Sequence, residues 1–291
     1  MLSHVQSFEY LYQRFFGPRF DEWLRSKILL LALLGFAVHL ILWALYNSEY
    51  SSIQTNDVLL LQSPLAALYT PFSILLFYEV YELIRAIPSS FSVAVGKQFE
   101  VVTLLIVRDV FKNLSLFEPS VVGENYVEIA LIVAECVAFL FLFYTALRFH
   151  SYGSGPKLTT VQEADVERFI SYKKAISFLL FIIYILVALF SFIGWVYLAS
   201  KGQIVVSKEI FFLDFFTFLI VVDIFILLFS YKLSHDFVHL ARNTGFVLST
   251  VILRVAISSK GFPAVVLFIL SGILGLAILR ITNRDWNPPV R

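Results

Sequence analysis

Long apolar stretches fill most of this 291-residue chain, and they limit its fold more than any other feature. A helix crosses the apolar core of a bilayer with about 20 mostly apolar residues. Hydrophobic residues make up 59% of the chain and charged residues 15%, whereas about 25% of a soluble domain is charged. The sequence therefore predicts an all-α integral membrane protein with little of the chain outside the bilayer.

Eight segments have the length and composition of a membrane span. The third and the seventh are the least apolar because charged residues interrupt them, but both are long enough and their connections are short. We predict spans near residues 27–46, 58–85, 91–112, 126–148, 173–200, 209–231, 236–258 and 262–281. An even number of spans places both termini on the same side of the membrane.

Lysine and arginine in the connections predict the orientation of the spans. Cytoplasmic connections of membrane proteins contain an excess of these residues. Most of them lie in the N-terminal segment, the 84–91 turn, the central connection and the C-terminal tail, and the opposite side has Lys112, Lys201, Lys208 and Lys260. We therefore predict that both termini are cytoplasmic, and we expect a multi-pass protein of a bacterial inner membrane.

The N-terminal residues 1–26 are predicted to lie on the membrane surface. Apolar and aromatic residues recur at helical spacing over Val5–Phe16, and the following Gly17-Pro18 pair ends the pattern. The first 25 residues are too polar for the apolar region of a signal peptide. We interpret residues 1–26 as an interfacial amphipathic helix that anchors the chain.

The central connection divides the chain into two halves of four spans each. It begins with the flexible, helix-breaking sequence SYGSGP at residues 151–156. The predicted organisation is a first four-helix unit (27–150), a cytoplasmic linker and helix extension (151–172), a second four-helix unit (173–282) and a C-terminal tail (283–291).

The two halves repeat a pattern of charge. Each has an acid on its second span and a cation on its third, so that Glu79 corresponds to Asp223 and Arg108 corresponds to Arg254. We interpret this pattern as a duplication that produced two related four-helix units in parallel orientation. The alternative is a chance similarity between helices that are all rich in Phe, Leu, Ile and Val.

Charged residues inside the spans are the candidate functional residues. A charge near the centre of a bilayer costs roughly 3 kcal/mol, so such residues usually pair with one another or line a polar path. The candidate ion path or buried charge network consists of Glu79, Glu82, Lys97, Glu100, Arg108, Asp109, Glu128, Glu135, Asp223, Arg242 and Arg254.

Helical spacing predicts partners for two of the cations. Lys97 and Glu100 are three residues apart and can pair directly on one helix face. Arg108 lies farther along the same span, and we expect it to pair with Glu135 or Asp109.

The second and third spans are joined by a short turn, which makes them antiparallel neighbours. Glu79 and Glu82 are therefore expected to approach Lys97 or Glu100. Three acids around one lysine at low dielectric favour the neutral form of at least one acid. That acid would be a candidate proton acceptor.

Three histidines are candidates for titration near neutral pH or for haem ligation. His39 lies well inside an apolar run, whereas His235 and His239 lie at the start of the seventh span. A haem between His39 and one of the other two is a less favoured hypothesis. The alternative for His235 and His239 is a cytoplasmic interfacial cluster.

Small residues in the eighth span predict close helix packing. Ser271, Gly272 and Gly275 lie near its middle, and such residues let helices approach closely in lipid. The partner is another helix of the same chain, or a second subunit as the alternative.

Several functional classes are excluded or disfavoured. No nucleotide-binding loop, zinc-binding helix or nucleophile elbow is present, so we expect no enzyme and neither a cofactor nor a metal ion. The single cysteine, Cys136, excludes an intrachain disulfide, and the net charge of +1 argues against a nucleic-acid partner.

The function that the sequence favours is translocation of protons or small ions along the buried charges, as a channel or a transporter. In the main alternative these charges only fix helix register, and the protein is a non-conducting accessory or scaffold subunit of a larger membrane complex. A quinone- or haem-binding anchor is less favoured. Besides the lipid bilayer, a homo-oligomer or a larger membrane complex stays open as a partner.

Overall fold

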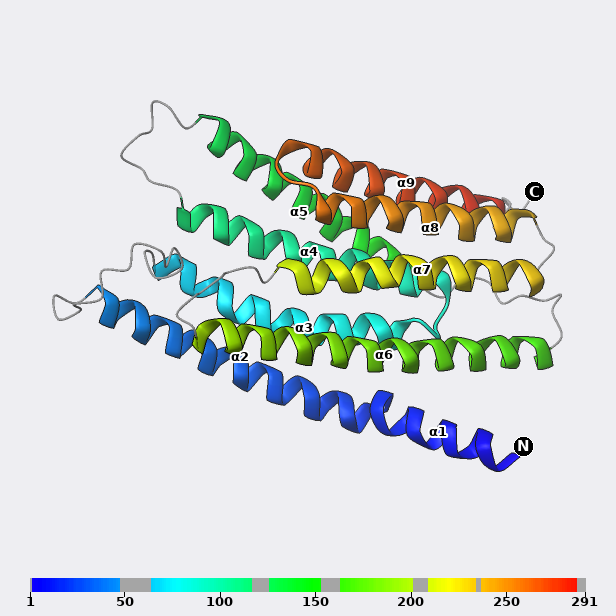
Figure 1. Cartoon of the computed structure of the whole chain (residues 1–291). Helices are drawn as coiled ribbons and strands as arrows, with labels where there is room; N and C mark the ends of the chain where they lie inside the picture. Colours follow the sequence, from blue (N-terminus) through cyan, green and yellow to red (C-terminus); the bar gives the residue numbers. More distant parts are fainter. Residues whose placement is uncertain are drawn as a thin grey trace. The chain divides into compact units, whose positions relative to one another are not determined.

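The computed structural model describes residues 2–47, 64–116, 126–152, 163–200, 209–233 and 237–286, and these residues are helical apart from short turns such as 87–90 and 259–261. Figure 1 shows the helices in chain order. They are α1 (Leu2–Phe16), α2 (Pro18–Tyr46), the 3-10 helix η2 (Pro64–Leu68), α3 (Tyr69–Ala86), α4 (Phe91–Leu116), α5 (Tyr126–Tyr152), α6 (Glu163–Ser200), α7 (Glu209–Leu233), α8 (Phe237–Ser258) and α9 (Phe262–Trp286).

Among these described residues, six helical segments are long and apolar enough to cross a membrane. They are Glu9–Leu45, Pro64–Ala86, Tyr126–Tyr152, Glu167–Ser191, Phe237–Ser258 and Phe262–Thr282. A shorter apolar helix covers Phe215–Tyr231 within α7, and the charged helix α4 is not among the six. The all-helical membrane architecture is therefore supported, and the number of eight spans stays a prediction.

The first two helices meet at the predicted Gly17-Pro18 break. Helix α1 ends at Phe16, as predicted, and α2 begins at Pro18, the first helical position, where the missing N–H of proline removes no helical hydrogen bond. Residues 18–26 therefore belong to the same helix as the first predicted span. The interfacial position of residues 1–26 stays a prediction.

The chain forms two compact units. The first consists of Met1–Arg85 and Leu104–Cys136, and the second of Ala86–Thr103 and Val137–Arg291. Helices α4 and α5 contribute to both units. This division differs from the predicted repeat units, 27–150 and 173–282, and the duplication stays a prediction.

In the first unit, aromatic contacts fasten α1 to α3. The hydroxyl of Tyr81, a fully buried residue, donates a hydrogen bond of 2.9 Å to the carbonyl oxygen of Phe15. The rings of Phe16 and Tyr81 are stacked, with centroids 5.9 Å apart. The end of the amphipathic helix is therefore held by both a ring contact and a hydrogen bond.

In the second unit, α8 packs against α7 on one side and α9 on the other. The antiparallel pair α8 and α9 is visible in Figure 1 in orange to red. Ser249 Oγ donates to the carbonyl oxygen of Ser271 over 2.9 Å, and Ser271 Oγ donates to that of Ser249 over 2.8 Å. The predicted close packing at Ser271–Gly275 is thus confirmed, with α8 of the same chain as a partner.

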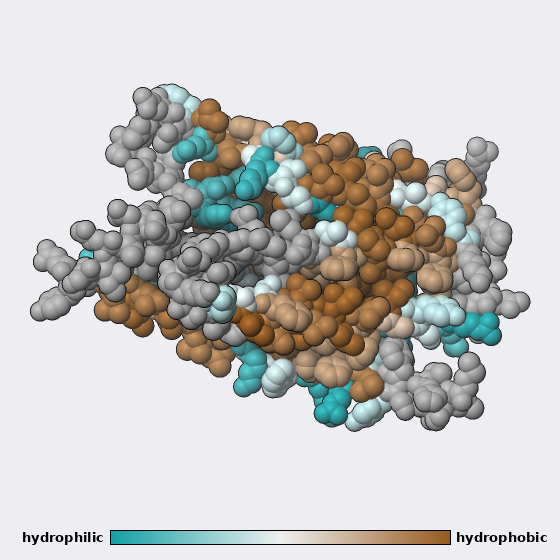
Figure 2. Space-filling model, viewed as in Figure 1, coloured by the Kyte–Doolittle hydropathy of each residue, from teal (hydrophilic) through white to brown (hydrophobic). Residues whose placement is uncertain are grey.

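Large apolar side chains cover much of the surface that Figure 2 shows. On α2, for example, Leu30, Leu33 and Leu34 are 53%, 67% and 54% exposed. A surface of this kind is unfavourable in water and favourable against lipid. The exposed apolar side chains therefore support the placement of these helices in a lipid bilayer.

Candidate functional site

Three buried polar side chains from three helices meet in the second unit. Arg254 of α8 donates from Nη2 to Asp223 Oδ2 of α7 over 2.6 Å and to Gln98 Oε1 of α4 over 2.8 Å. Gln98 Nε2 in turn donates to Asp223 Oδ2 over 3.0 Å. Each member therefore contacts the other two, and we call these three residues the Arg254 cluster.

The Arg254 cluster is buried almost completely. Arg254 and Gln98 are 4% and 5% exposed, and the Asp223 side chain is 13% exposed. An ion pair at this depth is stable only when further hydrogen bonds satisfy its polar atoms, and Gln98 supplies two of them. Within the part of the chain that the structure describes, Arg254 Nε and Nη1 have no hydrogen-bond acceptor. The guanidinium therefore keeps two donor groups for a water molecule or an anion.

The sequence identified two of the three members. Asp223 and Arg254 were candidates because they are charged residues inside apolar spans, whereas Gln98 was missed. Its only signal is that it interrupts an apolar segment with a neutral amide next to Lys97. The rotation of α4 decides that Gln98 faces inward.

Lys173 of α6 is a second buried cation in this unit, and the sequence pattern did not single it out. It is 4% exposed, and its Nζ donates to the carbonyl oxygen of Ser89 over 2.7 Å. The ammonium also lies 5.0 Å from the ring centroids of Phe91 and Phe169. Asp223 is near enough for the opposite charges to interact. Aromatic faces and a carbonyl oxygen thus stabilise this ammonium in place of a directly bonded carboxylate.

The predicted ion pair between Lys97 and Glu100 is confirmed. Lys97 Nζ lies 2.9 Å from Glu100 Oε1, and the two side chains are 15% and 51% exposed. Glu100 is therefore a half-exposed residue. The expected approach of this pair to Glu79 and Glu82 would join the two units, and it stays a prediction.

In the first unit, Arg108 pairs with Asp109, one of its two predicted partners. Arg108 is 5% exposed, its Nη2 lies 3.1 Å from Asp109 Oδ1, and its guanidinium lies 5.1 Å from the ring centroid of Tyr69. Glu135 instead accepts two hydrogen bonds from Asn113 Nδ2, of 3.0 and 2.9 Å. The alternative pairing of Arg108 with Glu135 is therefore wrong, and Glu135 binds the amide of Asn113 on α4 instead.

A further ion-pair network holds α2 against α3. Arg85 Nη1 lies 2.7 Å from Asp21 Oδ2 and 2.8 Å from Glu82 Oε1, and the hydroxyl of Tyr78 donates to Asp21 Oδ1 over 2.8 Å. Of these residues the sequence selected only Glu82 as a candidate. Asp21 lies in the first turn of α2, outside the predicted span, so its role depends on the tertiary structure.

The remaining charged candidates differ in exposure. Glu79 of α3 and Arg242 of α8 are half-buried, whereas Glu128 is exposed in the first turn of α5. A negative charge is favourable at that end of a helix. Glu128 is therefore the candidate with the least structural involvement.

The histidines lie in different surroundings. His39 of α2 is 9% exposed and its Nδ1 lies 2.6 Å from Thr70 Oγ1 of α3, and His239 of α8 is 6% exposed. His235 lies outside the described residues. Among the residues described, no group of three or more His, Cys, Asp or Glu side chains could hold a metal ion. Haem ligation by these histidines stays a prediction.

Long apolar helices with polar clusters between them are the architecture of a helical multi-pass membrane protein. Comparison of the chain with protein-family models, curated proteins and solved structures found no match. The function of this protein is therefore inferred from its own residues.

Proposed function

We propose that this protein translocates protons or small ions across a membrane along its buried charged residues. The observation that carries this proposal is the Arg254 cluster, an ion pair of 2.6 Å with an amide that contacts both partners, buried between α4, α7 and α8. Polar residues at such positions in membrane proteins commonly mark ion pathways and proton relays.

Within this proposal Asp223 is the relay group. Its carboxylate accepts hydrogen bonds from Arg254 and Gln98, so one donor stays bonded while the other exchanges with water. Arg254 Nε and Nη1 offer further hydrogen-bond donors to water molecules along the path. The Lys97–Glu100 pair lies on α4 of the same unit, but Glu100 faces nearly the opposite side of the helix from Gln98 and lies outside this path.

The test is flux through the purified protein in liposomes that contain a pH-sensitive dye. Asp223→Asn removes the relay charge and keeps the shape, so we expect it to reduce flux by about tenfold or more, which requires a barrier increase of ~1.4 kcal/mol. The matched control is Glu128→Gln, which removes the exposed acid of α5 and should leave flux unchanged. Gel filtration of both variants in detergent checks that they are folded.

Wild-type vesicles that conduct none of H⁺, Na⁺, K⁺ or Cl⁻ under either voltage polarity would exclude the proposal. Equal effects of Asp223→Asn and Glu128→Gln would exclude the Arg254 cluster as the path.

The second candidate function is that of a non-conducting subunit of a larger membrane complex. Its support is that Glu100 and Asp109 are 51% and 49% exposed although they lie in the interior turns of α4. Each of the two acids pairs with a cation of α4, but if α4 spans the membrane, the exposed part of each pair needs water or a partner chain to cover it. Absence of flux together with stably co-purifying chains would favour this function.

The finer architecture that accompanies the proposal has eight spans in two related four-helix units, with both termini in the cytoplasm of a bacterial cell and the spans in its inner membrane. In this arrangement Asp223 and Arg254 of the second four-helix unit (173–282) correspond to Glu79 and Arg108 of the first four-helix unit (27–150). The two arginines differ in their partners, since Arg108 pairs with its neighbour Asp109 and Arg254 with the preceding helix.

A further inference from the structure

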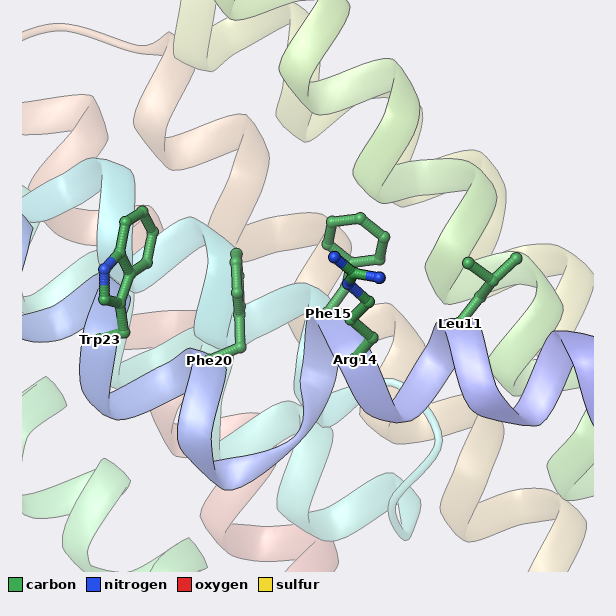
Figure 3. A pocket seen from close by; sticks show the side chains of 5 residues that line it. All are labelled: Leu11, Arg14, Phe15, Phe20 and Trp23. Atoms are coloured by element: carbon green, nitrogen blue, oxygen red, sulfur yellow. The ribbon is translucent and has the colours of Figure 1, made fainter.

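A pocket of about 390 Å³ lies at the junction of α1 and α2, in the first unit (Figure 3). Side chains on both sides of the Gly17-Pro18 break line it, and Figure 3 shows them projecting from the same side of the two helices. The lining residues are Leu11, Arg14, Phe15, Phe20 and Trp23. The volume lies within the range of ~300–1,000 Å³ that is usual for small-molecule sites.

Aromatic contacts make the wall of this pocket. The ring of Phe20 lies 5.7 Å from that of Phe15 in an edge arrangement and 5.7 Å from that of Trp23. Phe15 is itself fixed, because its carbonyl oxygen accepts the hydrogen bond of the buried Tyr81. The pocket is thus built on a part of α1 that the rest of the first unit holds in place.

The pocket combines this apolar wall with a cation. Arg14 is the charged residue in the lining, and its side chain is exposed. Asp21, an acid in the first turn of α2, forms an ion pair of 2.7 Å with Arg85. Because Arg85 compensates the charge of Asp21, this nearby acid does not cancel the positive charge of Arg14. An apolar cavity with a guanidinium at its edge fits an amphiphile with an anionic head.

The position of the pocket along the chain indicates which class of amphiphile it would bind. It lies near the start of the apolar segment Glu9–Leu45, the first segment that can cross a membrane among the described residues. Trp23 is 54% exposed, and tryptophan is enriched at the level of the lipid headgroups. Amphipathic helices at this level bind anionic lipids through basic residues. We propose that the pocket binds an anionic phospholipid of the bilayer, with its phosphate on Arg14 and the upper part of an acyl chain along Phe15, Phe20 and Trp23.

The bound headgroup would fix the angle between the interfacial helix α1 and the spanning helix α2. This site is independent of the proposed ion path, because all of its lining residues belong to the first unit and none belongs to the Arg254 cluster. A negative result for the lipid site would therefore not contradict the proposed ion path, and a negative flux result would not contradict the lipid site.

The test uses Trp23 as a reporter in the full-length protein. Trp43→Phe, Trp195→Phe and Trp286→Phe leave Trp23 as the single tryptophan of the chain. The protein is reconstituted in vesicles that contain phosphatidylglycerol or phosphatidylcholine with brominated acyl chains, and quenching is measured in mixtures of the two. One arginine contact is worth about 1 kcal/mol, so we expect phosphatidylglycerol to be favoured about fivefold.

Arg14→Gln should abolish most of this preference, so that the two lipids quench nearly equally. Arg14→Lys should retain part of the preference. The matched control is Arg19→Gln, which changes another exposed arginine, in the first turn of α2, that does not line the pocket, and it should retain the preference. Inorganic phosphate should not relieve the quenching.

Three results would overturn the proposal. Equal quenching by both lipids would show that Trp23 contacts the surrounding lipids without selecting an anionic headgroup. Equal losses in Arg14→Gln and Arg19→Gln would show general surface attraction. Absence of quenching would show that a protein segment covers Trp23.

Discussion

At the scale of single residues, the three buried lysine and arginine side chains among the described residues each have a different kind of partner. Arg254 has an acid and an amide on two other helices, Arg108 has its sequence neighbour and a tyrosine ring, and Lys173 has a carbonyl oxygen and two phenylalanine rings. A buried cation loses its hydration whatever its partner is. These three kinds of contact therefore offset the same free-energy cost of desolvation.

Removing one member of the buried Asp223–Arg254 pair should destabilise the protein. Arg254→Leu leaves the Asp223 charge without its cation, and the expected loss is about 3–5 kcal/mol in the free energy of unfolding. Thermal unfolding in detergent and the expression level measure this loss. The double variant Asp223→Leu with Arg254→Leu should recover much of it, because two apolar residues need no partner. A double variant less stable than Arg254→Leu alone would contradict the pairing.

At the scale of the helices, the packing of α8 and α9 depends on residues without bulky side chains. A Cβ atom at Gly275 would lie 3.1 Å from Ser249 Oγ, 3.2 Å from Phe99 Cε2 and 3.3 Å from Phe149 Cε2. Three neighbours on different helices therefore confine this position, and the helices can be this close only because position 275 is glycine.

Gly275→Leu should separate these helices. Overpacking a core position typically costs about 1–3 kcal/mol, and we expect the melting temperature in detergent to fall accordingly. The control is Gly194→Leu in α6, where an added Cβ would meet nothing within 4 Å. Gly194→Leu should change the melting temperature little, and an equal fall in both variants would show that the effect is not one of packing.

At the scale of the whole molecule, the distribution of lysine and arginine predicts the orientation in the membrane. Cysteines at Ser51 and Ser120 should react with an impermeant thiol reagent added outside intact cells, and a cysteine at Ser154 should not. The native Cys136 is exposed and must first be replaced by serine, which also provides the background control. These three serines lie outside the described residues. Labelling of the cysteine at position 154 from outside would reverse the predicted orientation.

The class of the protein and most of its helices follow from local properties of the amino-acid sequence. Mean apolarity over 20 residues is a local property, so the membrane class, the break at Gly17-Pro18 and the helix boundaries near residues 91, 126 and 262 could all be predicted from the sequence. The Lys97–Glu100 pair could be predicted too, because the two residues are separated by one helical turn.

Which polar residues meet depends instead on how the helices pack against one another. Gln98 joins Asp223 and Arg254, Asn113 takes the place of Arg108 beside Glu135, and Lys173 binds the carbonyl oxygen of Ser89. Each contact depends on the rotation and depth of one helix against another. Helices that are apolar on nearly every face contain little information about this rotation, so packing at small residues and the satisfaction of buried polar atoms determine it.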